Sequence, residues 1–242
     1  MKKKWILFLA TTISVTTALS AAVPVSNAGA ESVKATTSYS NAVYYGETKN
    51  DLPNGKGKLE WSDKKWYSGE FVQGKRSGTG KYYNEYIGEY GRTYRLVYNG
   101  DWKNDRMNGS GTLTEKITEA SGEVIQNSIT TGEFVNDVWK SGYKVRHAVA
   151  DPDFEFIYKG NETTISIWDT NGSLLEHWKE GKLFRVQYQK GSVYKEYWIF
   201  PTETAKEEKT KQASIRYLQS ITSQVAPYLK KFEQFAKQVP LK

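Results

Sequence analysis

The stretch that decides the fold is Tyr67-Ser68-Gly69-Glu70-Phe71, followed by Gly78-Thr79-Gly80. Both segments recur twice, as Tyr44-Tyr45-Gly46-Glu47 with Gly55-Lys56-Gly57, and as Tyr98-Asn99-Gly100-Asp101-Trp102 with Gly109-Ser110-Gly111. In every copy the later glycines follow the opening glycine by nine and eleven residues. Three copies with one internal spacing predict a structural repeat.

Further along the chain the pattern weakens. A fourth copy opens with Gly132-Glu133-Phe134, but Thr130 stands where the other copies have tyrosine. A fifth opening is Tyr158-Lys159-Gly160. The similar segment Tyr86-Ile87-Gly88-Glu89-Tyr90 lies too close to the copy at Tyr98 to be a repeat of its own.

Each copy has the chemistry of a β-hairpin. Side chains alternate between the two faces of a strand, so Tyr67, Gly69 and Phe71 share one face, where the glycine leaves room for a ring. Gly74 lies in the expected turn and can adopt a positive φ. Because a single hairpin is marginal in water, stacked hairpins are expected. The sequence predicts an all-β repeat, an elongated single-layer antiparallel sheet of stacked β-hairpins with an aromatic ladder.

The pattern Tyr-x-Gly-Glu-Phe/Trp-x-x-Gly-x-x-x-Gly-x-Gly resembles the MORN repeat. Residues 67–80 match every position of this pattern. In the copy at 98–111, Asp101 replaces the glutamate and Asp105 replaces the middle glycine, and in the copy at 44–57, Asp51 replaces the middle glycine. Thr48 stands in the aromatic place of the first copy. We expect MORN-like repeats over residues 44–143. The resemblance implies scaffolding, protein partners or membrane association, and it implies no catalytic residue.

The amino terminus has the features of an export signal. Lys2, Lys3 and Lys4 precede an uncharged, mostly apolar stretch, and Ala28 and Ala30 supply the small residues of a cleavage site before Glu31. We predict a signal peptide, formed as a helix, over residues 1–30 and a linker over 31–43. The alternative is a retained membrane anchor. The predicted location is secreted or extracellular, with non-covalent retention at a bacterial cell envelope.

Composition limits the chemistry. The 242 residues include no cysteine and two histidines, which excludes disulfides, thiolate metal sites and a cysteine nucleophile. The net charge is +7, but residues 31–202 hold 23 basic and 23 acidic residues, and residues 203–242 hold 8 and 4. A neutral body argues against nucleic acid as a ligand.

An insert at residues 81–97 is rich in tyrosine. Two interpretations remain open, a longer hairpin whose tyrosines pack on the sheet, or a stacking surface for a sugar or a peptide. The candidate binding surface consists of Tyr82, Tyr83, Tyr86, Tyr90 and Tyr94.

The last third of the chain changes character. Residues 144–202 predict a degenerate continuation of the hairpins, with a strand at 173–178. Residues 203–242 predict an amphipathic helical tail, kinked near Ala226 by Pro227. This helix could pack on the sheet, form a homodimeric coiled coil, or bind an anionic membrane or wall polymer.

These features predict an exported, non-enzymatic binding or scaffold protein without cofactors, whose partner is a protein or a cell-envelope component. One alternative is a cell-wall carbohydrate-binding module that uses exposed Tyr and Trp. A second is a hydrolase with an unrecognised site in residues 144–200. His147 near Asp151 and Asp153 is a weak catalytic candidate, and Asp169 to Glu180 only faintly resembles a calcium loop.

Overall fold

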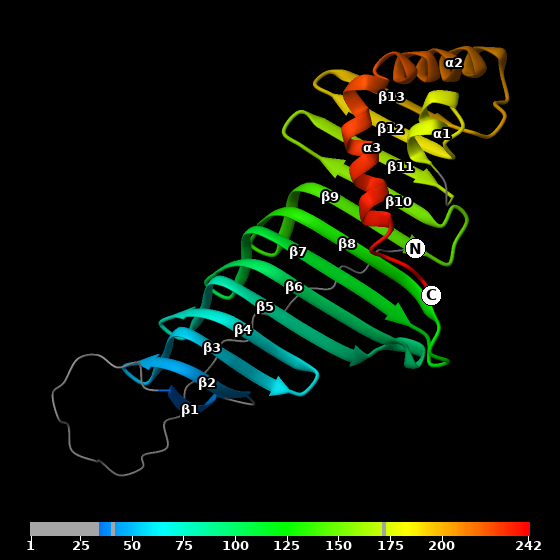
Figure 1. The fold of residues 1–242 in the computed structure, drawn as a ribbon. Helices are drawn as coiled ribbons and strands as arrows, with labels where there is room; N and C mark the ends of the chain where they lie inside the picture. The colour runs from blue at the N-terminus through cyan, green and yellow to red at the C-terminus, as the bar shows by residue number, and fades with distance from the viewer. Residues whose placement is uncertain (1–33, 40–41, 171–172) are drawn as a thin grey trace, which may run out of the picture.

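The computed structural model describes residues 34–39, 42–170 and 173–242. The predicted signal peptide, including Ala28 and Ala30, lies outside the described residues. The described chain forms one 13-stranded antiparallel sheet in which every strand pairs with its sequence neighbours (Figure 1). The predicted sheet of stacked hairpins is thus confirmed.

The strands follow one another without a crossover. Their bounds are β1 Lys34–Tyr39, β2 Ala42–Lys49, β3 Leu52–Ser62, β4 Lys65–Val72, β5 Lys75–Ile87, β6 Thr93–Lys103, β7 Arg106–Thr118, β8 Val124–Val135, β9 Val138–Ala148, β10 Phe154–Lys159, β11 Thr163–Asp169, β12 Arg185–Lys190 and β13 Val193–Trp198. A 3-10 turn at Glu89–Gly91 links β5 to β6. The helices are α1 Leu174–Glu180, α2 Ala205–Ser220 and α3 Thr222–Ala236.

A row of glycines crosses the sheet from β2 to β9. One glycine of each strand lies opposite a glycine of the next, in the order Gly46, Gly57, Gly69, Gly80, Gly100, Gly111, Gly132 and Gly142. A Cβ on Gly69 would lie 2.5 Å from the Gly80 Cα. The strands therefore approach here more closely than side chains would permit.

Each repeat tyrosine lies over this row. A Cβ on Gly57, Gly80 or Gly111 would lie 2.2–2.3 Å from the hydroxyl of Tyr44, Tyr67 or Tyr98 respectively. The hydroxyls of these three tyrosines donate to the carbonyls of Glu47, Glu70 and Asp101 at 2.7, 3.0 and 3.1 Å. Glycine removes the Cβ from the space that the ring fills, and the backbone carbonyl satisfies the buried phenol.

The rings form a continuous edge-to-face ladder across the repeats. Successive centroids in the order Tyr44, Phe71, Tyr67, Trp102, Tyr98 and Phe134 lie 5.0–5.2 Å apart, with interplanar angles of 79–89°. T-shaped pairs of this kind each add about 0.5–1.5 kcal/mol beyond area burial. The three tyrosines are fully buried although this half of the sheet has one layer. The ladder is the core of this half.

The conformation of the hairpin turns explains why Asp51 and Asp105 can replace the middle glycine of the repeat pattern. Asn50-Asp51, Asn104-Asp105 and Asn136-Asp137 all have positive φ, which Asn and Asp tolerate in two-residue hairpin turns. Asp105 also links neighbouring repeats, because its carboxylate accepts from the Arg76 backbone N–H at 3.0 Å. The Asp105 N–H donates to the Arg76 carbonyl at 3.0 Å.

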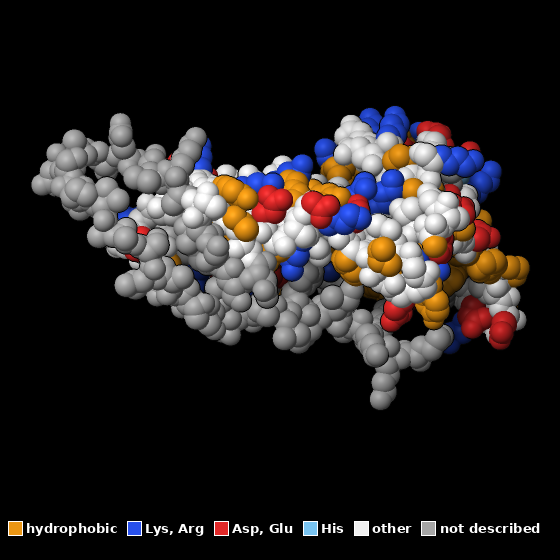
Figure 2. Space-filling model, turned by 90° about the horizontal axis from the view of Figure 1, so that it is seen from below, with side chains coloured by type: hydrophobic (Ala, Val, Ile, Leu, Met, Phe, Trp, Pro, Cys, Tyr) orange, Lys and Arg blue, Asp and Glu red, His pale blue; other side chains and the backbone are white. Residues whose placement is uncertain are grey.

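The C-terminal half has a second layer. α1 and α3 lie on one face of the sheet, seen at the front in Figure 1, and α2 lies against β13. The core beneath them contains the residues Ile129, Val145, Phe156, Ile165, Ile167, Trp178, Val186, Leu229 and Phe232. Figure 2 shows lysine and arginine side chains at this helical end and along the middle of the molecule, interspersed with acidic and hydrophobic side chains.

The two cores lie on opposite faces of the same sheet. Adjacent residues of a strand point to opposite faces. In β8, Ile129 belongs to the helix-covered core, whereas the neighbouring Thr130 is buried opposite Leu113 on the ladder face. Strands β8 and β9 therefore contribute side chains to both cores.

Four expectations need correction. Strand β1 lies within the expected linker at 31–43 and pairs with β2. Residues 174–180 form helix α1 rather than a strand, because the Ser173 hydroxyl accepts from the Glu176 N–H and Gly181 ends the helix with a left-handed conformation. The helices also make the C-terminal half two-layered, not single-layered.

The tail breaks at Ile221 instead of near Ala226. Pro227 lies inside α3, which continues through it to Ala236.

Candidate binding surfaces

The five tyrosines of the insert do not form one surface. Tyr82, Tyr86 and Tyr94 lie on the ladder face, Tyr83 lies on the opposite face, and Tyr90 lies in the turn, 83% exposed. The insert extends β5 and β6 into a longer hairpin, in which the rings of Tyr86 and Tyr94 stack at 5.3 Å. This arrangement places only part of the candidate surface together.

Tyr82 belongs to the packing of the ladder face. Its ring lies 6.4 Å from Trp61 and 6.1 Å from Trp102, and the Arg76 guanidinium lies 5.7 Å from its centroid. Burial raises the pKa of Tyr82, and the nearby Arg76 charge opposes that rise. The surroundings of Tyr82 are those of a structural residue.

The opposite face of β2–β7, called here the open face, has no described helix over it (Figure 1). The strand register places Tyr45, Lys58, Ser68, Lys81 and Asn99 side by side across β2–β6. A groove of about 630 Å³ over β1–β5 is lined by Tyr45, Lys58 and Ser68 of this row. We call the row the polar strip, and it offers one hydrogen-bonding side chain per strand.

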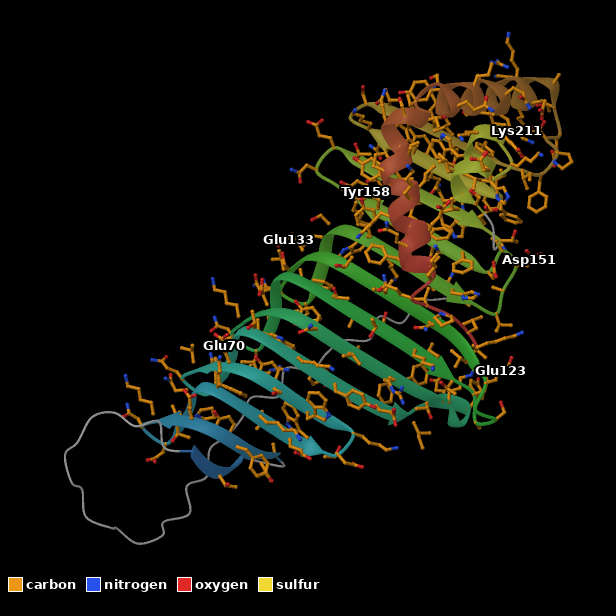
Figure 3. The ribbon with its side chains drawn as sticks, in the orientation of Figure 1. Glu70, Glu123, Glu133, Asp151, Tyr158 and Lys211 are labelled. Carbon is orange, nitrogen blue, oxygen red and sulfur yellow. The ribbon has the colours of Figure 1, made fainter. Side chains whose placement is uncertain are left out.

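The polar strip is flanked on each side. On one side the rings of Trp66 and Tyr83 stack at 5.5 Å with an interplanar angle of 9°. The ammonium groups of Lys58 and Lys81 each lie 5.8 Å from the Trp66 centroid. On the other side lies Glu70, near the margin of the sheet that carries the β4–β5 turn. Glu133 lies further along the same margin, near the β8–β9 turn (Figure 3).

Beyond Tyr83 the open face carries a charged cluster. The Glu85 carboxylate accepts from Arg95 Nε at 2.8 Å and from the Tyr83 hydroxyl at 2.9 Å. These hydrogen bonds, that from Arg95 first, lower the pKa of Glu85. Glu85 is thus held ionised and paired, which suits it to fixing the Tyr83 ring.

A second exposed surface lies at the last hairpin. The C-terminal aromatic patch consists of Phe184, Trp198, Ile199 and Phe200, and the last three are 43–53% exposed. The Arg185 guanidinium lies between two indoles, 4.8 Å from Trp168 and 4.1 Å from Trp198. Exposed apolar clusters of this kind mark contact sites.

The catalytic candidates have structural surroundings. The His147 Nδ1 lies 2.9 Å from the Val239 carbonyl and its Nε2 lies 3.4 Å from Asp153. Asp169 contacts His177 at 2.6 Å, and Glu155 contacts Arg146 at 3.1 Å. Each of these three carboxylates is thus paired with a basic side chain.

Among the described residues, no group of three or more His, Asp or Glu side chains is arranged to hold a metal ion. The segment that faintly resembles a calcium loop contains helix α1. Within the same residues, no helix is long and apolar enough to cross a lipid bilayer.

Sequence reasoning missed two of these surfaces. The run Trp198-Ile199-Phe200 before Pro201 is a signal for an exposed apolar end, since proline closes the strand there. The Trp66–Tyr83 pair had no local signal, because its partners come from strands related only by the register.

The comparisons agree with the geometry of the hairpins. The MORN repeat family matches residues 44–65, 67–84 and 98–114. MORN repeat-containing protein 3 of Xenopus laevis is 42% identical over 72 residues, which cover 28% of this chain and 29% of that protein. Alsin of Mus musculus is 33% identical over 103 residues, which cover 43% of this chain and 6% of alsin.

The chain spans less than a third of the first relative and a small part of alsin. The likeness lies in the repeats, where the glycine row, the ring ladder and the family matches coincide. The hairpins within residues 44–114 are therefore MORN repeats.

Proposed function

We propose that this chain is an exported, non-enzymatic scaffold protein that acts at the bacterial cell envelope through contacts with a protein or a membrane surface. MORN repeats generally serve as scaffold motifs that bind proteins or membrane surfaces. The basic start, apolar stretch and small residues at Ala28 and Ala30 support export. A chain without cysteine also fits an extracellular location in a bacterium.

The observation that carries the proposal is the C-terminal aromatic patch. A scaffold needs separate contact surfaces on a rigid frame, and the continuous sheet joins the open face to this patch. Trp198 of the patch contacts the Arg185 guanidinium, and Trp and Arg are among the residues most enriched at the energetic centres of protein interfaces. Lys211 donates to the carbonyls of Ile199 and Phe200 at 3.1 and 2.8 Å, which fixes the patch against α2.

The contact function is tested by retention on isolated cell envelopes. The double variant Trp198→Ala/Phe200→Ala removes two exposed rings of the patch, and we expect most of the bound protein to move to the soluble fraction. Tyr90→Ala is the matched control, because Tyr90 is an exposed aromatic residue outside the patch. Equal retention of the double variant and the wild type would contradict the proposal.

Export is tested separately by expressing the full chain in a bacterium and sequencing the amino terminus of the protein in the medium. The expected first residue is Glu31. Protein that stays in the cells with an intact Met1 would contradict export without affecting the result on envelopes.

A further inference from the structure

We propose that the polar strip of the open face binds a neutral, linear glycan that lies across strands β2–β6. The inference rests on the proposed function in one respect, since it makes a wall glycan one of the envelope components that the scaffold contacts. It names a ligand class for a surface distinct from the C-terminal aromatic patch.

The direction of the strip determines the shape of the ligand. Neighbouring strands lie about 4.8 Å apart, so the side chains of the strip form a series of hydrogen-bonding groups at right angles to the strands. These groups are a phenol, an ammonium, a hydroxyl, a second ammonium and an amide. An extended chain with hydroxyls at regular intervals can contact all of them, whereas a compact small molecule contacts only part of the groove.

The charge of the open face favours an uncharged ligand. On this face Lys56, Lys58 and Lys81 are balanced by Glu60, Glu70 and Asp101, and Lys56, Lys58 and Glu70 line the groove. Lys58 is paired with Glu60 at 2.6 Å, and Lys56 lies opposite Glu70 in the register. Because donors and acceptors alternate over short distances, the groove suits sugar hydroxyls, which both donate and accept.

The aromatic side chains are placed for a sugar. Tyr45 lies in the groove with 48% of its surface exposed. The stacked pair Trp66 and Tyr83 forms an apolar wall next to Lys58 and Lys81. A pyranose ring has apolar C–H faces and a polar rim, so it can contact ring and lysine together.

The same composition disfavours a protein or a membrane at this surface. Protein interface centres are depleted in lysine and acidic residues, yet the middle of the strip carries Lys58 and Lys81. An anionic bilayer requires an excess of positive charge, which this balanced face lacks. Binding of a membrane surface is one outcome of the test.

The test is a titration of the full chain with chitohexaose, a neutral linear hexamer, by isothermal calorimetry. Vesicles with 30 mol% phosphatidylglycerol are titrated in parallel. We expect saturable binding of the hexamer that changes less than about threefold when salt rises from 50 to 500 mM, because no net charge is neutralised. Binding of the vesicles alone would overturn the proposal.

Two variants locate the site. Ser68→Trp places a bulky side chain at an exposed position in the middle of the strip, and Lys81→Ala removes one donor. We expect each to weaken binding at least about tenfold, the size of one charged hydrogen bond. Lys103→Ala is the matched control, since Lys103 is also exposed on a repeat strand but lies near the turn.

The remaining outcomes separate this inference from the proposed function. Hexamer binding that survives Ser68→Trp, or no hexamer binding by a correctly folded wild type, overturns the glycan site. If envelope retention still depends on Trp198 and Phe200 in that case, the scaffold proposal stands. Circular dichroism shows whether Ser68→Trp lowers the melting temperature. If it does, the binding affinity of Lys81→Ala decides the test.

Discussion

The Tyr67 ring fills the space that a side chain on Gly80 would need. A Cβ at Gly80 would lie 2.3 Å from the Tyr67 hydroxyl and 2.4 Å from its Cζ, although the two residues are on different strands. The same relation holds between Tyr98 and Gly111. The glycines of the repeat are therefore part of the aromatic core, because they define the volume that the rings occupy.

The first prediction concerns Gly69→Val. Its Cβ would lie 2.5 Å from the Gly80 Cα and 2.6 Å from the Thr79 carbonyl, and backbone atoms cannot move aside as a flexible side chain would. We expect a loss of about 3 kcal/mol or more in the free energy of unfolding. Thermal melting followed by circular dichroism measures it.

The control for that prediction is Gly122→Ala. Gly122, unlike Gly69, has a positive φ, and a Cβ there would meet no atom within 4 Å, so the variant reports backbone strain without a steric clash. A melting temperature of Gly69→Val equal to that of the wild type would refute the role assigned to the glycine row.

The second prediction separates two roles of Asp105. Glycine at this position keeps the positive φ but loses the carboxylate that accepts from the Arg76 backbone N–H and Nε at 3.0 and 3.2 Å. We expect Asp105→Gly to cost about 1 kcal/mol and Asp105→Ala about 2 kcal/mol, because alanine also strains the turn. Urea denaturation of the two variants checks the order, and the reverse order would contradict it.

Much of the repeat half could be predicted from the sequence because its signals are local. The spacing of Gly69, Gly78 and Gly80 around Tyr67 defines a hairpin within fourteen residues. The C-terminal half was harder, because Leu174 and Trp178 are helical only through the Ser173 and Gly181 caps and their burial beneath α2 and α3. A short apolar segment does not distinguish strand from helix.

The third prediction concerns alkaline pH. Burial raises the pKa of Tyr98 from 10.0 to about 12. The pKa of Tyr98 is higher in the folded state than in the unfolded state. The contribution of its protonated form to the free energy of unfolding is therefore complete below pH 10 and is lost as the pH rises from 10 to about 12. We expect this residue to contribute roughly 2 kcal/mol to the loss.

Urea titrations between pH 9 and pH 12 measure this effect. Tyr98→Phe removes the titrating group, so its stability should fall less steeply over that range than that of the wild type. The variant should be less stable at pH 7, since it lacks the hydrogen bond to the Asp101 carbonyl. Parallel pH profiles would show that Tyr98 does not titrate as predicted.

The fourth prediction concerns the attachment of the C-terminal segment. His147 contacts the Val239 carbonyl and stacks on Phe154 at 4.0 Å, and Asn127 donates to the Pro240 carbonyl at 3.0 Å. We expect His147→Ala to cost about 1–2 kcal/mol and to speed amide hydrogen exchange at the end of α3.

His177→Ala serves as the control for His147→Ala. It removes the contact with Asp169 and should loosen α1 while leaving exchange near Val239 unchanged. Faster exchange near Val239 in the control only would contradict the assignment of His147 as the anchor.

The candidate surfaces were less accessible to sequence reasoning than the fold. Tyr82 and Tyr83 are adjacent in sequence, but strand alternation sends one into the ladder packing and the other to the open face. The polar strip draws one residue from each of five strands, so it exists only once the register is known. A list of tyrosines in one insert could not define it.

The exchange of buried faces along the sheet has a consequence for cooperativity. Strands β8 and β9 carry side chains of both hydrophobic cores, one core on each face of the sheet. Neither core can therefore unfold without exposing apolar side chains of the other. Repeat arrays ordinarily fray from their ends, unit by unit. In this chain we expect the helical half to stabilise the last MORN hairpins. Local unfolding should then begin at β1 and should not reach the middle of the sheet.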